Sequence, residues 1–221
     1  MKLAYPEWHD IMEWKGNSFC SLVLEHPRLL LDFLMDLKMQ IEKLDGQAVL
    51  SENDVPIEIS QHMELITDFV FFDLNKKSLI TKIITALDKM AKGEFFYERT
   101  LAFLSSVENY VDDLCMEFDA DVACEIPTVT GILKSVGLHI ETESTSLAEK
   151  IYTYMKLVRE YDRDKLFVFL NLRSFLKLDE LEQFMKTVVD HDFRVLLVDN
   201  CAYPLLKNER RLLIDKDLCE I

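Results

Sequence analysis

The sequence has few of the residues that form long linkers, membrane spans or disulfide frameworks. Only five of its 221 residues are Gly and five are Pro, so long disordered linkers are not expected. No apolar run reaches the roughly 18 residues of a membrane span, and the charged N-terminal segment lacks the apolar centre of a secretory signal. The five cysteines form neither a Cys-x-x-Cys pair nor a Cys/His cluster. This pattern favours reduced thiols and predicts a cytoplasmic protein with no membrane partner.

Signals of catalysis are also missing. The chain contains no Gly-Lys-Ser/Thr and no Gly-x-Ser-x-Gly, and its five histidines are scattered. A nucleotide-binding α/β protein would carry a glycine-rich phosphate loop where its first buried strand meets a helix. Here that junction has no glycine and includes the anionic Glu25; it reads Leu24-Glu25-His26-Pro27. We therefore expect a protein that is not an enzyme.

Positive charge is scarce. The chain has 40 acidic and 25 basic residues, a formal net charge of −15, which argues against a protein coated in nucleic acid. Its cations nevertheless gather in two clusters, which indicates an uneven surface potential. The alternative is that these are ordinary solvated helix faces. The clusters comprise Lys76, Lys77, Lys82, Lys89 and Lys92, and then Lys150, Lys156, Arg159, Arg163 and Lys165.

Two largely apolar runs organise the fold. Residues 166–172 carry no charge, and residues 193–200 have a continuous apolar centre; both runs are typical of strands buried on both faces. Between them, residues 179–191 repeat apolar side chains at helical spacing. Strand, helix and strand at this spacing predict a βαβ unit with parallel strands. The sequence therefore predicts an α/β fold with a mainly parallel sheet flanked by helices.

Further segments extend this sheet and cover it. We expect a buried strand over residues 18–25, followed at once by a helix over 27–44 that begins with Pro27. A helix over 146–161 begins with a capping box, Ser146 and Glu149. Additional strands are expected at the ends of the chain and between the helices: around residues 1–14, 47–51, 55–60, 63–72, 138–142 and 212–214. For residues 63–72 a buried helix is the alternative.

A helical section interrupts the strands. A helix capped by Ser78 and ended by Gly93 is followed by a longer one over 94–116. Pro127 then opens a short helix that ends before Gly137. The first two helices form an expected αα-hairpin, and five apolar side chains of the longer helix are expected to face inward: Leu101, Leu104, Val107, Val111 and Leu114. This pattern divides the chain into a head, residues 1–75 and 137–221, and a helical leg, residues 76–136.

An acidic cluster follows the longest helix of the leg. Its carboxylates stand at alternating positions and then four residues further on: Glu117, Asp119, Asp121 and Glu125. Hard cations such as Ca²⁺ take six to eight oxygen ligands, mostly carboxylates and carbonyls of flexible backbone. The spacing is not that of an EF-hand. A solvated acidic turn and a metal site both remain possible interpretations.

The order of these segments resembles a known family. The stretch ILKSVGLHIETESTSLAEK, followed by KLFVFLNLRSFLKLDE, resembles the helix, strand, capped helix and central strand of the Csn2 family of type II-A CRISPR adaptation proteins, in its shorter form. The resemblance extends back through ELITDFVFFDLN and more weakly through NSFCSLVLE. It covers most of the chain, although the N-terminal third and residues 76–92 match less well.

The resemblance implies a fold and a function. Members have an α/β head related to P-loop ATPases that has lost its nucleotide site, and an α-helical leg. They form homotetrameric rings, bind Ca²⁺ near the head–leg junction, and thread linear double-stranded DNA from its ends, without cleavage, during spacer acquisition. Their expected partners are DNA ends, the CRISPR adaptation integrase and the RNA-guided effector nuclease.

Carried onto this sequence, the resemblance assigns Ca²⁺ to Glu117, Asp119, Asp121 and Glu125. Because DNA must meet cations inside a ring, the expected DNA-contacting residues lie on the leg: Lys76, Lys77, Lys82 and Lys134. An alternative is a protein-interaction scaffold for the adaptation complex that does not itself bind DNA, which an acidic exterior would suit.

Overall fold

The chain forms two compact units. The computed structural model describes residues 1–16, 18–141 and 146–221. One unit comprises residues 1–72 and 144–221, and the second comprises residues 73–143. The first division falls close to the expected boundary after residue 75, and the second falls later than the expected boundary at residue 137. The chain therefore leaves the α/β unit and returns to it once.

A parallel sheet forms the centre of the first unit. Its five strands lie in the order β6 (Met63–Ile66), β7 (Leu166–Leu170), β8 (Arg194–Asp199), β3 (Phe19–Leu24) and β9 (Glu209–Ile214), and every neighbouring pair is parallel. The predicted βαβ unit is confirmed as β7, α7 (Leu178–Asp190) and β8. β3 and β8 are buried along almost their whole length, as their largely apolar sequences predict.

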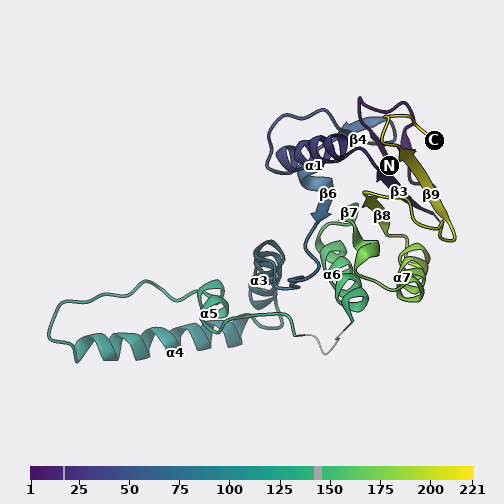
Figure 1. Cartoon of the computed structure of the whole chain (residues 1–221). Coiled ribbons are helices and arrows are strands. Elements are labelled where there is room, and N and C mark those ends of the chain that lie inside the picture. Colours follow the sequence, from purple (N-terminus) through teal and green to yellow (C-terminus); the bar gives the residue numbers. More distant parts are fainter. Residues whose placement is uncertain (17, 142–145) are drawn as a thin grey trace. The chain divides into compact units, whose positions relative to one another are not determined.

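Helices cover both faces of this sheet. Successive strand residues point to opposite faces. Val168 belongs to the same buried apolar cluster as Phe33 of α1 (Pro27–Ile41), whereas the neighbouring Phe169 contacts Phe184 of α7, with ring centroids 6.2 Å apart. α6 (Leu147–Tyr161) lies beside α7 (Figure 1) and buries four side chains, including Tyr154. The predicted α/β class, a parallel sheet flanked by helices, is confirmed.

A small antiparallel sheet extends the core on the α1 side. Its strands lie in the order β2 (Met12–Glu13), β1 (Lys2–Ala4), β4 (Val49–Glu52) and β5 (Val55–Ile57). Tyr5 and Trp8, in the turn between β1 and β2, each stack on Phe33 of α1 with ring centroids 5.2 Å apart. A one-turn helix, α2 (Ile59–His62), leads from β5 into β6, and a 3₁₀ turn, η1 (Leu172–Ser174), follows β7.

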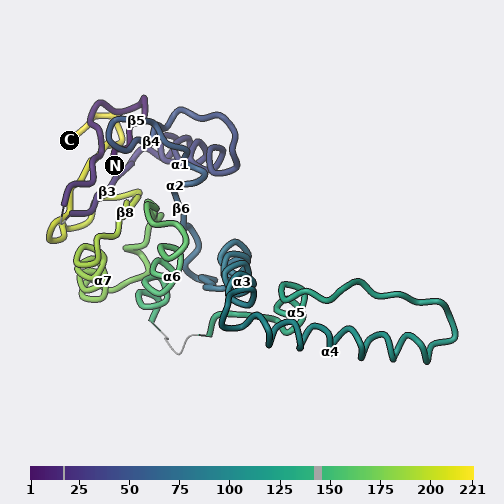
Figure 2. Tube along the Cα trace, turned by 180° about the vertical axis from the view of Figure 1, so that it is seen from behind, coloured from purple at the N-terminus to yellow at the C-terminus, as the bar shows by residue number. Residues whose placement is uncertain are grey.

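Among its described residues, the second unit contains three helices: α3 (Lys77–Ala91), α4 (Tyr97–Met116) and α5 (Val129–Ser135). α3 and α5 lie side by side (Figure 2). α3 buries Leu79 and Ile84, whereas no residue of α4 is buried. The inward-facing stripe expected on the longer helix is therefore wrong for the isolated chain.

Some expected elements are shorter than predicted or differ in kind. β6 ends at Ile66, because the Asp68 carboxylate accepts the backbone N–H groups of Val70 and Phe71 and turns the chain. The strand expected over 138–142 does not form in residues 138–141, and Thr142 lies outside the described residues. There the side chain of Asn75 accepts the Ile140 N–H at 2.6 Å, in place of a strand partner.

Candidate nucleic-acid and metal-binding surfaces

The four lysines expected to contact DNA lie on two packed helices. Lys76 is the N-cap residue of α3, Lys77 is its first residue, and Lys82 follows in its second turn. Lys134 lies in the last turn of α5, which packs against α3. Lys77 and Lys134 are exposed, whereas Lys76 and Lys82 are half-buried. The structure thus brings the two helices together but presents only two of the four side chains freely to solvent.

Part of the remaining basic cluster is neutralised within α3. The Lys92 ammonium lies 2.6 Å from the Asp88 carboxylate, one turn earlier. An ion pair of this kind leaves less positive charge for a phosphate. Exposed pairs are weak, however, and the side chain can exchange partners. The N-terminal half of α3 is consequently the more favourable part of the cluster for DNA.

α4 presents apolar side chains to solvent. Phe103, Tyr110 and Leu114 are 52%, 64% and 54% exposed, and none of the helix's 20 residues is buried. Together with Val107 they stand at positions i, i+4, i+7 and i+11, which is the spacing of one coiled-coil seam. Apolar area at this spacing is stabilised when it leaves water. The helix therefore carries a ready surface for another chain.

The acidic cluster lies in an irregular segment. Residues 117–128 have no regular secondary structure and lead from the end of α4 back to α5 (Figure 1). All four predicted calcium ligands are exposed. Asp119 and Asp121 line one hollow, together with Asp112 of α4, whereas Glu117 and Glu125 do not. The structure thus groups two of the four residues and adds one that the sequence interpretation had left out.

Asp112 is the residue that the sequence interpretation missed. The Cys124 thiol donates to its Oδ1 at 3.4 Å, and this hydrogen bond to a carboxylate is the main cause of the raised pKa of Cys124. A sequence signal did exist, because Asp112 stands one turn before the end of the helix that leads into the acidic segment.

The side chains of this segment are of the type that binds Ca²⁺, but they are not arranged as a metal site. Carboxylate oxygens on irregular backbone are the ligands that Ca²⁺ prefers. Within residues 1–16, 18–141 and 146–221, however, no three His, Cys, Asp or Glu side chains are arranged to hold a metal ion. A calcium site here requires the 117–125 segment to close around the ion.

The helix start that follows β3 is occupied by the protein's own side chain. The His26 ring nitrogen Nδ1 accepts the Leu29 backbone N–H at 3.3 Å, and Pro27 at the first position has no N–H to offer. A phosphate at a helix N-terminus needs these free N–H groups. The geometry gives a physical reason why the Leu24–Pro27 junction is unsuited to nucleotide.

Near the carboxyl ends of β7 and β8, where ligands usually bind in a parallel α/β fold, this protein has a buried ion-pair cluster that also includes the start of β9. Arg173, just after β7, donates from Nε to Asp199 at the end of β8 and from Nη2 to Glu209 at the start of β9, both at 2.8 Å. The side chains of all three are at most 2% exposed. Glu209 also accepts from the Ser21 hydroxyl and from Arg211.

The two carboxylates of this cluster differ in their pKa. Burial raises the pKa of Asp199 to about 6, although Arg173 opposes the shift. Burial acts in the same direction on Glu209, but the Leu206 N–H, the Ser21 hydroxyl and two arginines lower the pKa of that carboxyl overall. Asp199 has fewer donors, and its Oδ1 is buried with no hydrogen-bond partner in the described chain. The cluster is therefore a structural element in which one carboxylate is poorly satisfied.

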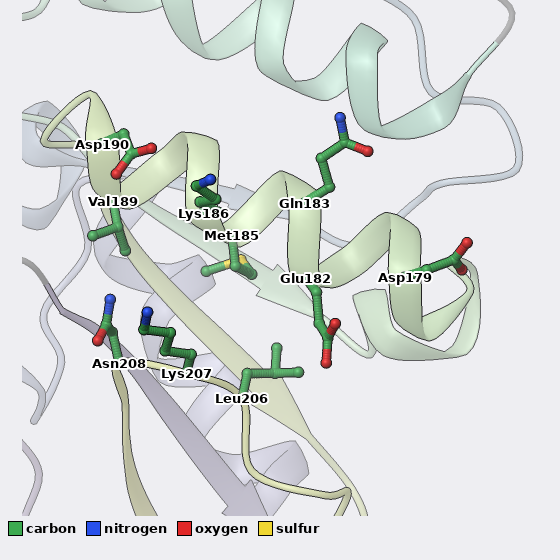
Figure 3. A pocket seen from close by; sticks show the side chains of 10 residues that line it. All are labelled: Asp179, Glu182, Gln183, Met185, Lys186, Val189, Asp190, Leu206, Lys207 and Asn208. Carbon is green, nitrogen blue, oxygen red and sulfur yellow. The ribbon is translucent and has the colours of Figure 1, made fainter.

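A separate cavity of about 630 Å³ lies between α7 and residues 206–208 (Figure 3). Its apolar side chains, Met185, Val189 and Leu206, are all buried. Charges of both signs surround them, with Lys186 and Lys207 among the carboxylates of α7. A mixed rim of this kind gives no sustained positive field, so it does not suit a phosphate backbone.

The fold defines the chain as an α/β protein with a parallel sheet and a helical second unit, and comparisons with known proteins agree. The family model of the CRISPR-associated protein Cas_Csn2 matches residues 40–218. CRISPR-associated protein Csn2 of Enterococcus faecalis is 21% identical over 180 residues, which is 80% of this chain and 81% of the relative. CRISPR-associated protein Csn2 of Streptococcus agalactiae is 23% identical over 118 residues, 53% of each chain.

A solved structure supports the same conclusion for the fold. The crystal structure of Stu0660 of Streptococcus thermophilus has a TM-score of 0.56 at 11% identity, covering 91% of this chain and 69% of that one. The chain belongs to the Csn2 family of type II-A CRISPR-associated proteins, a family of CRISPR adaptation. In the part of the chain that the structure describes, no helix is both long and apolar enough to cross a membrane.

Proposed function

We propose that this chain binds the ends of linear double-stranded DNA as a ring-shaped homotetramer during spacer acquisition, without cleaving the DNA and without reading its sequence. Family membership supports the setting in CRISPR adaptation. In this proposal, bound Ca²⁺ stabilises the form of the protein that binds DNA. The adaptation integrase and the RNA-guided effector nuclease are its protein partners in this role.

The observation that carries the proposal is the unburied helix α4. A 20-residue helix with no buried side chain and an exposed stripe of Phe103, Tyr110 and Leu114 is not stabilised by its own chain. A second copy supplies the missing partner surface, because the same stripe on each copy can pack against its equivalent. Assembly through α4 is therefore the step that DNA binding depends on.

Because the net charge is −15, DNA binding requires the basic residues to be separated from the acidic ones on the surface. DNA contacts to phosphate are independent of base sequence and weaken steeply with salt. Lys77 and Lys134 are the best candidates for such contacts because they are exposed on the packed α3–α5 pair. A ring favours binding despite the total charge, since the local field depends on the residues that line its opening.

Calcium is assigned to the segment that follows α4. Asp119, Asp121 and Asp112 already line one hollow, and Glu117 and Glu125 join them when the segment closes around the ion. Isothermal titration of the chelator-stripped protein tests this assignment. We expect binding by about 1 mM Ca²⁺ and its loss in an Asp119→Ala/Asp121→Ala variant, whereas an Asp179→Ala/Glu182→Ala variant should bind normally. Unchanged binding in the first variant would overturn the assignment.

A gel-shift experiment tests the proposed function. The same plasmid is offered in calcium as covalently closed circles and after linearisation, across salt from about 50 to 200 mM. We expect the linear form to bind and the closed form not to bind, with affinity falling by orders of magnitude over this salt range. Sequence-specific binding to closed circles, or binding indifferent to salt, contradicts the proposal.

The rival function is a scaffold that recruits the adaptation proteins and does not bind DNA. The large excess of acidic residues favours it, because such a surface suits basic protein partners. The same gel shift separates the two functions. A scaffold leaves both DNA forms unshifted at every salt concentration, while still binding its protein partners.

A further inference from the structure

A groove on the first unit has an apolar centre and an acidic rim. It has a volume of about 640 Å³ and lies along α1, between this helix, the turn that follows β1 and the loop that precedes β4. The C-terminal turn contributes Leu218. None of the proposed DNA or calcium residues lines it. The groove therefore needs an explanation of its own.

Exposed methionines form the apolar part. Met35 and Met39 stand one turn apart on α1 and are 47% and 40% exposed, and Leu218 opposite them is 54% exposed. Methionine is flexible and polarisable, and it is over-represented on surfaces that bind apolar partners. Two such side chains one turn apart match apolar side chains one turn apart on a partner helix.

Leu218 is held in this position at a cost to its backbone. It adopts φ of +63°, in the left-handed region that bulky residues seldom occupy. Asp215 fixes the turn, since its backbone oxygen accepts the Leu218 N–H and its carboxylate accepts the Cys219 N–H at 2.8 Å. The fold thus retains an exposed leucine at the groove in a conformation that it does not favour.

The rim of the groove carries net negative charge. Glu7, Asp32 and Asp45 line it against a single arginine, Arg28, whose guanidinium already pairs with Asp32 at 3.1 Å. His26 uses its ring nitrogen to cap α1. Burial is the main cause of the raised pKa of Tyr5 in the same groove, and the surrounding carboxylates raise this pKa further.

The wall of the groove is rigid. Asp36 of α1 is buried and accepts the Gln47 and Ala48 backbone N–H groups at 2.5 and 2.9 Å, and the Gln40 amide at 2.9 Å. These bonds fasten the loop before β4 to α1. A preorganised wall loses little entropy when a partner binds.

We propose that this groove is a docking site for a basic amphipathic helix of a partner protein. Apolar side chains of that helix cover Met35, Met39 and Leu218, and its flanking Lys or Arg residues pair with Glu7, Asp32 and Asp45. Nine of the thirteen residues that line the groove lie before position 40, where the family match begins. The docking proposed here is independent of DNA binding.

Fluorescence anisotropy with synthetic peptides tests the proposal without DNA. The probe is a labelled leucine/lysine peptide about five helical turns long, and the comparison is a leucine/glutamate peptide with the same apolar pattern. We expect the lysine peptide to bind the full-length protein and the glutamate peptide to bind at least about tenfold more weakly. Met35→Glu is the decisive variant, since it removes apolar contact while adding negative charge.

Docking in the groove predicts that Met35→Glu weakens binding of the lysine peptide by about tenfold or more. General attraction to an acidic protein predicts that this variant binds as tightly or more tightly. Asp32→Asn/Asp45→Asn should weaken binding by about three- to tenfold, whereas Asp179→Asn/Glu182→Gln, which removes the same charge from α7, should change it by less than about twofold. Equal loss in the two charge variants, or unweakened binding by Met35→Glu, overturns the proposal.

Discussion

The two units of this chain differ in which charged and apolar side chains they bury. The first unit buries the Arg173–Asp199–Glu209 ion pairs beside a sheet covered on both faces, so it completes its core within one chain. The second unit packs α3 against α5 but leaves all of α4 unburied, with aromatic side chains in solvent. The first unit thus completes its core within one chain, whereas the second leaves the apolar side chains of α4 for the assembly proposed above.

The comparison also separates the sites where substitutions act on stability from those where they act on function. A buried charge that loses its partner destabilises a protein strongly, whereas exposed side chains contribute little to stability. We therefore expect variants in the first unit to change the free energy of unfolding. Variants in the second unit should change assembly or DNA affinity.

The largest effect is expected for Arg173→Ala. Removing the guanidinium leaves Asp199 and Glu209 buried without their shared partner, and we expect a loss of about 3–5 kcal/mol in the free energy of unfolding. Urea denaturation measures this loss. Arg28→Ala is the matched control, because its pair with Asp32 is exposed and should contribute less than about 1 kcal/mol. Equal effects of the two variants would show that the cluster is not the buried element described above.

Asp199→Asn should gain stability relative to the wild type as the pH rises from 4 to 7. The pKa of Asp199 is raised to about 6 in the folded state, above its ordinary 3.8, so folding favours the protonated acid. The stability that protonated Asp199 contributes to the folded state is fully present below about pH 4 and is lost as the pH rises through 6. With about 1.4 kcal/mol for each pKa unit, the loss is about 3 kcal/mol.

Denaturation at pH 4, 5, 6 and 7 checks this prediction. The difference between variant and wild type should grow with pH over the stated window, because Asn does not ionise. Glu209, whose pKa is lowered, loses stability only as pH falls through its own lower range, so it does not produce this difference. A constant difference across the four pH values would contradict the assignment.

Lys77→Ala/Lys134→Ala should weaken DNA binding without changing stability. Each lost phosphate contact reduces the slope of log affinity against log salt by about one, and we expect about a tenfold loss of affinity, equal for unrelated DNA sequences. Filter binding of linear duplex across salt measures both quantities. Lys186→Ala/Lys207→Ala, on the first unit, is the matched control and should leave the slope unchanged.

Phe103→Glu/Tyr110→Glu should also change stability very little. Both side chains are more than half exposed, so the free energy of unfolding of the dilute protomer should change by less than about 0.5 kcal/mol. Light scattering after size exclusion should instead report loss of the oligomer. Ser105→Glu/Asn109→Glu adds the same charge on another face of α4 and should preserve assembly. A variant that unfolds rather than dissociates would contradict the division between the units.

Much of the first unit could be predicted from its sequence because its signals are local. The largely apolar runs at 166–172 and 193–200 identified β7 and β8, and Pro27 marked the start of α1. Boundaries were less accurate where one side chain redirected the backbone. Asp68 ended β6 early, and Asn171 adopts φ of +53° immediately after β7.

The candidate sites were harder to predict because they depend on neighbours distant in the sequence. Helical periodicity identified α4 correctly, but periodicity alone cannot distinguish an apolar stripe that faces its own core from one that awaits another chain. Asp112 joined the hollow of Asp119 and Asp121 only when the chain folded back after α4. The calcium and DNA assignments remain predictions.

One measurement tests the central claim, entry of DNA by its ends into a closed ring, most directly. A linear duplex carrying biotin at both ends is offered in calcium either free or with streptavidin already bound. The account predicts binding to the free duplex, none to the blocked duplex, and retention when streptavidin is added after the protein. Equal binding to free and blocked duplex would contradict it.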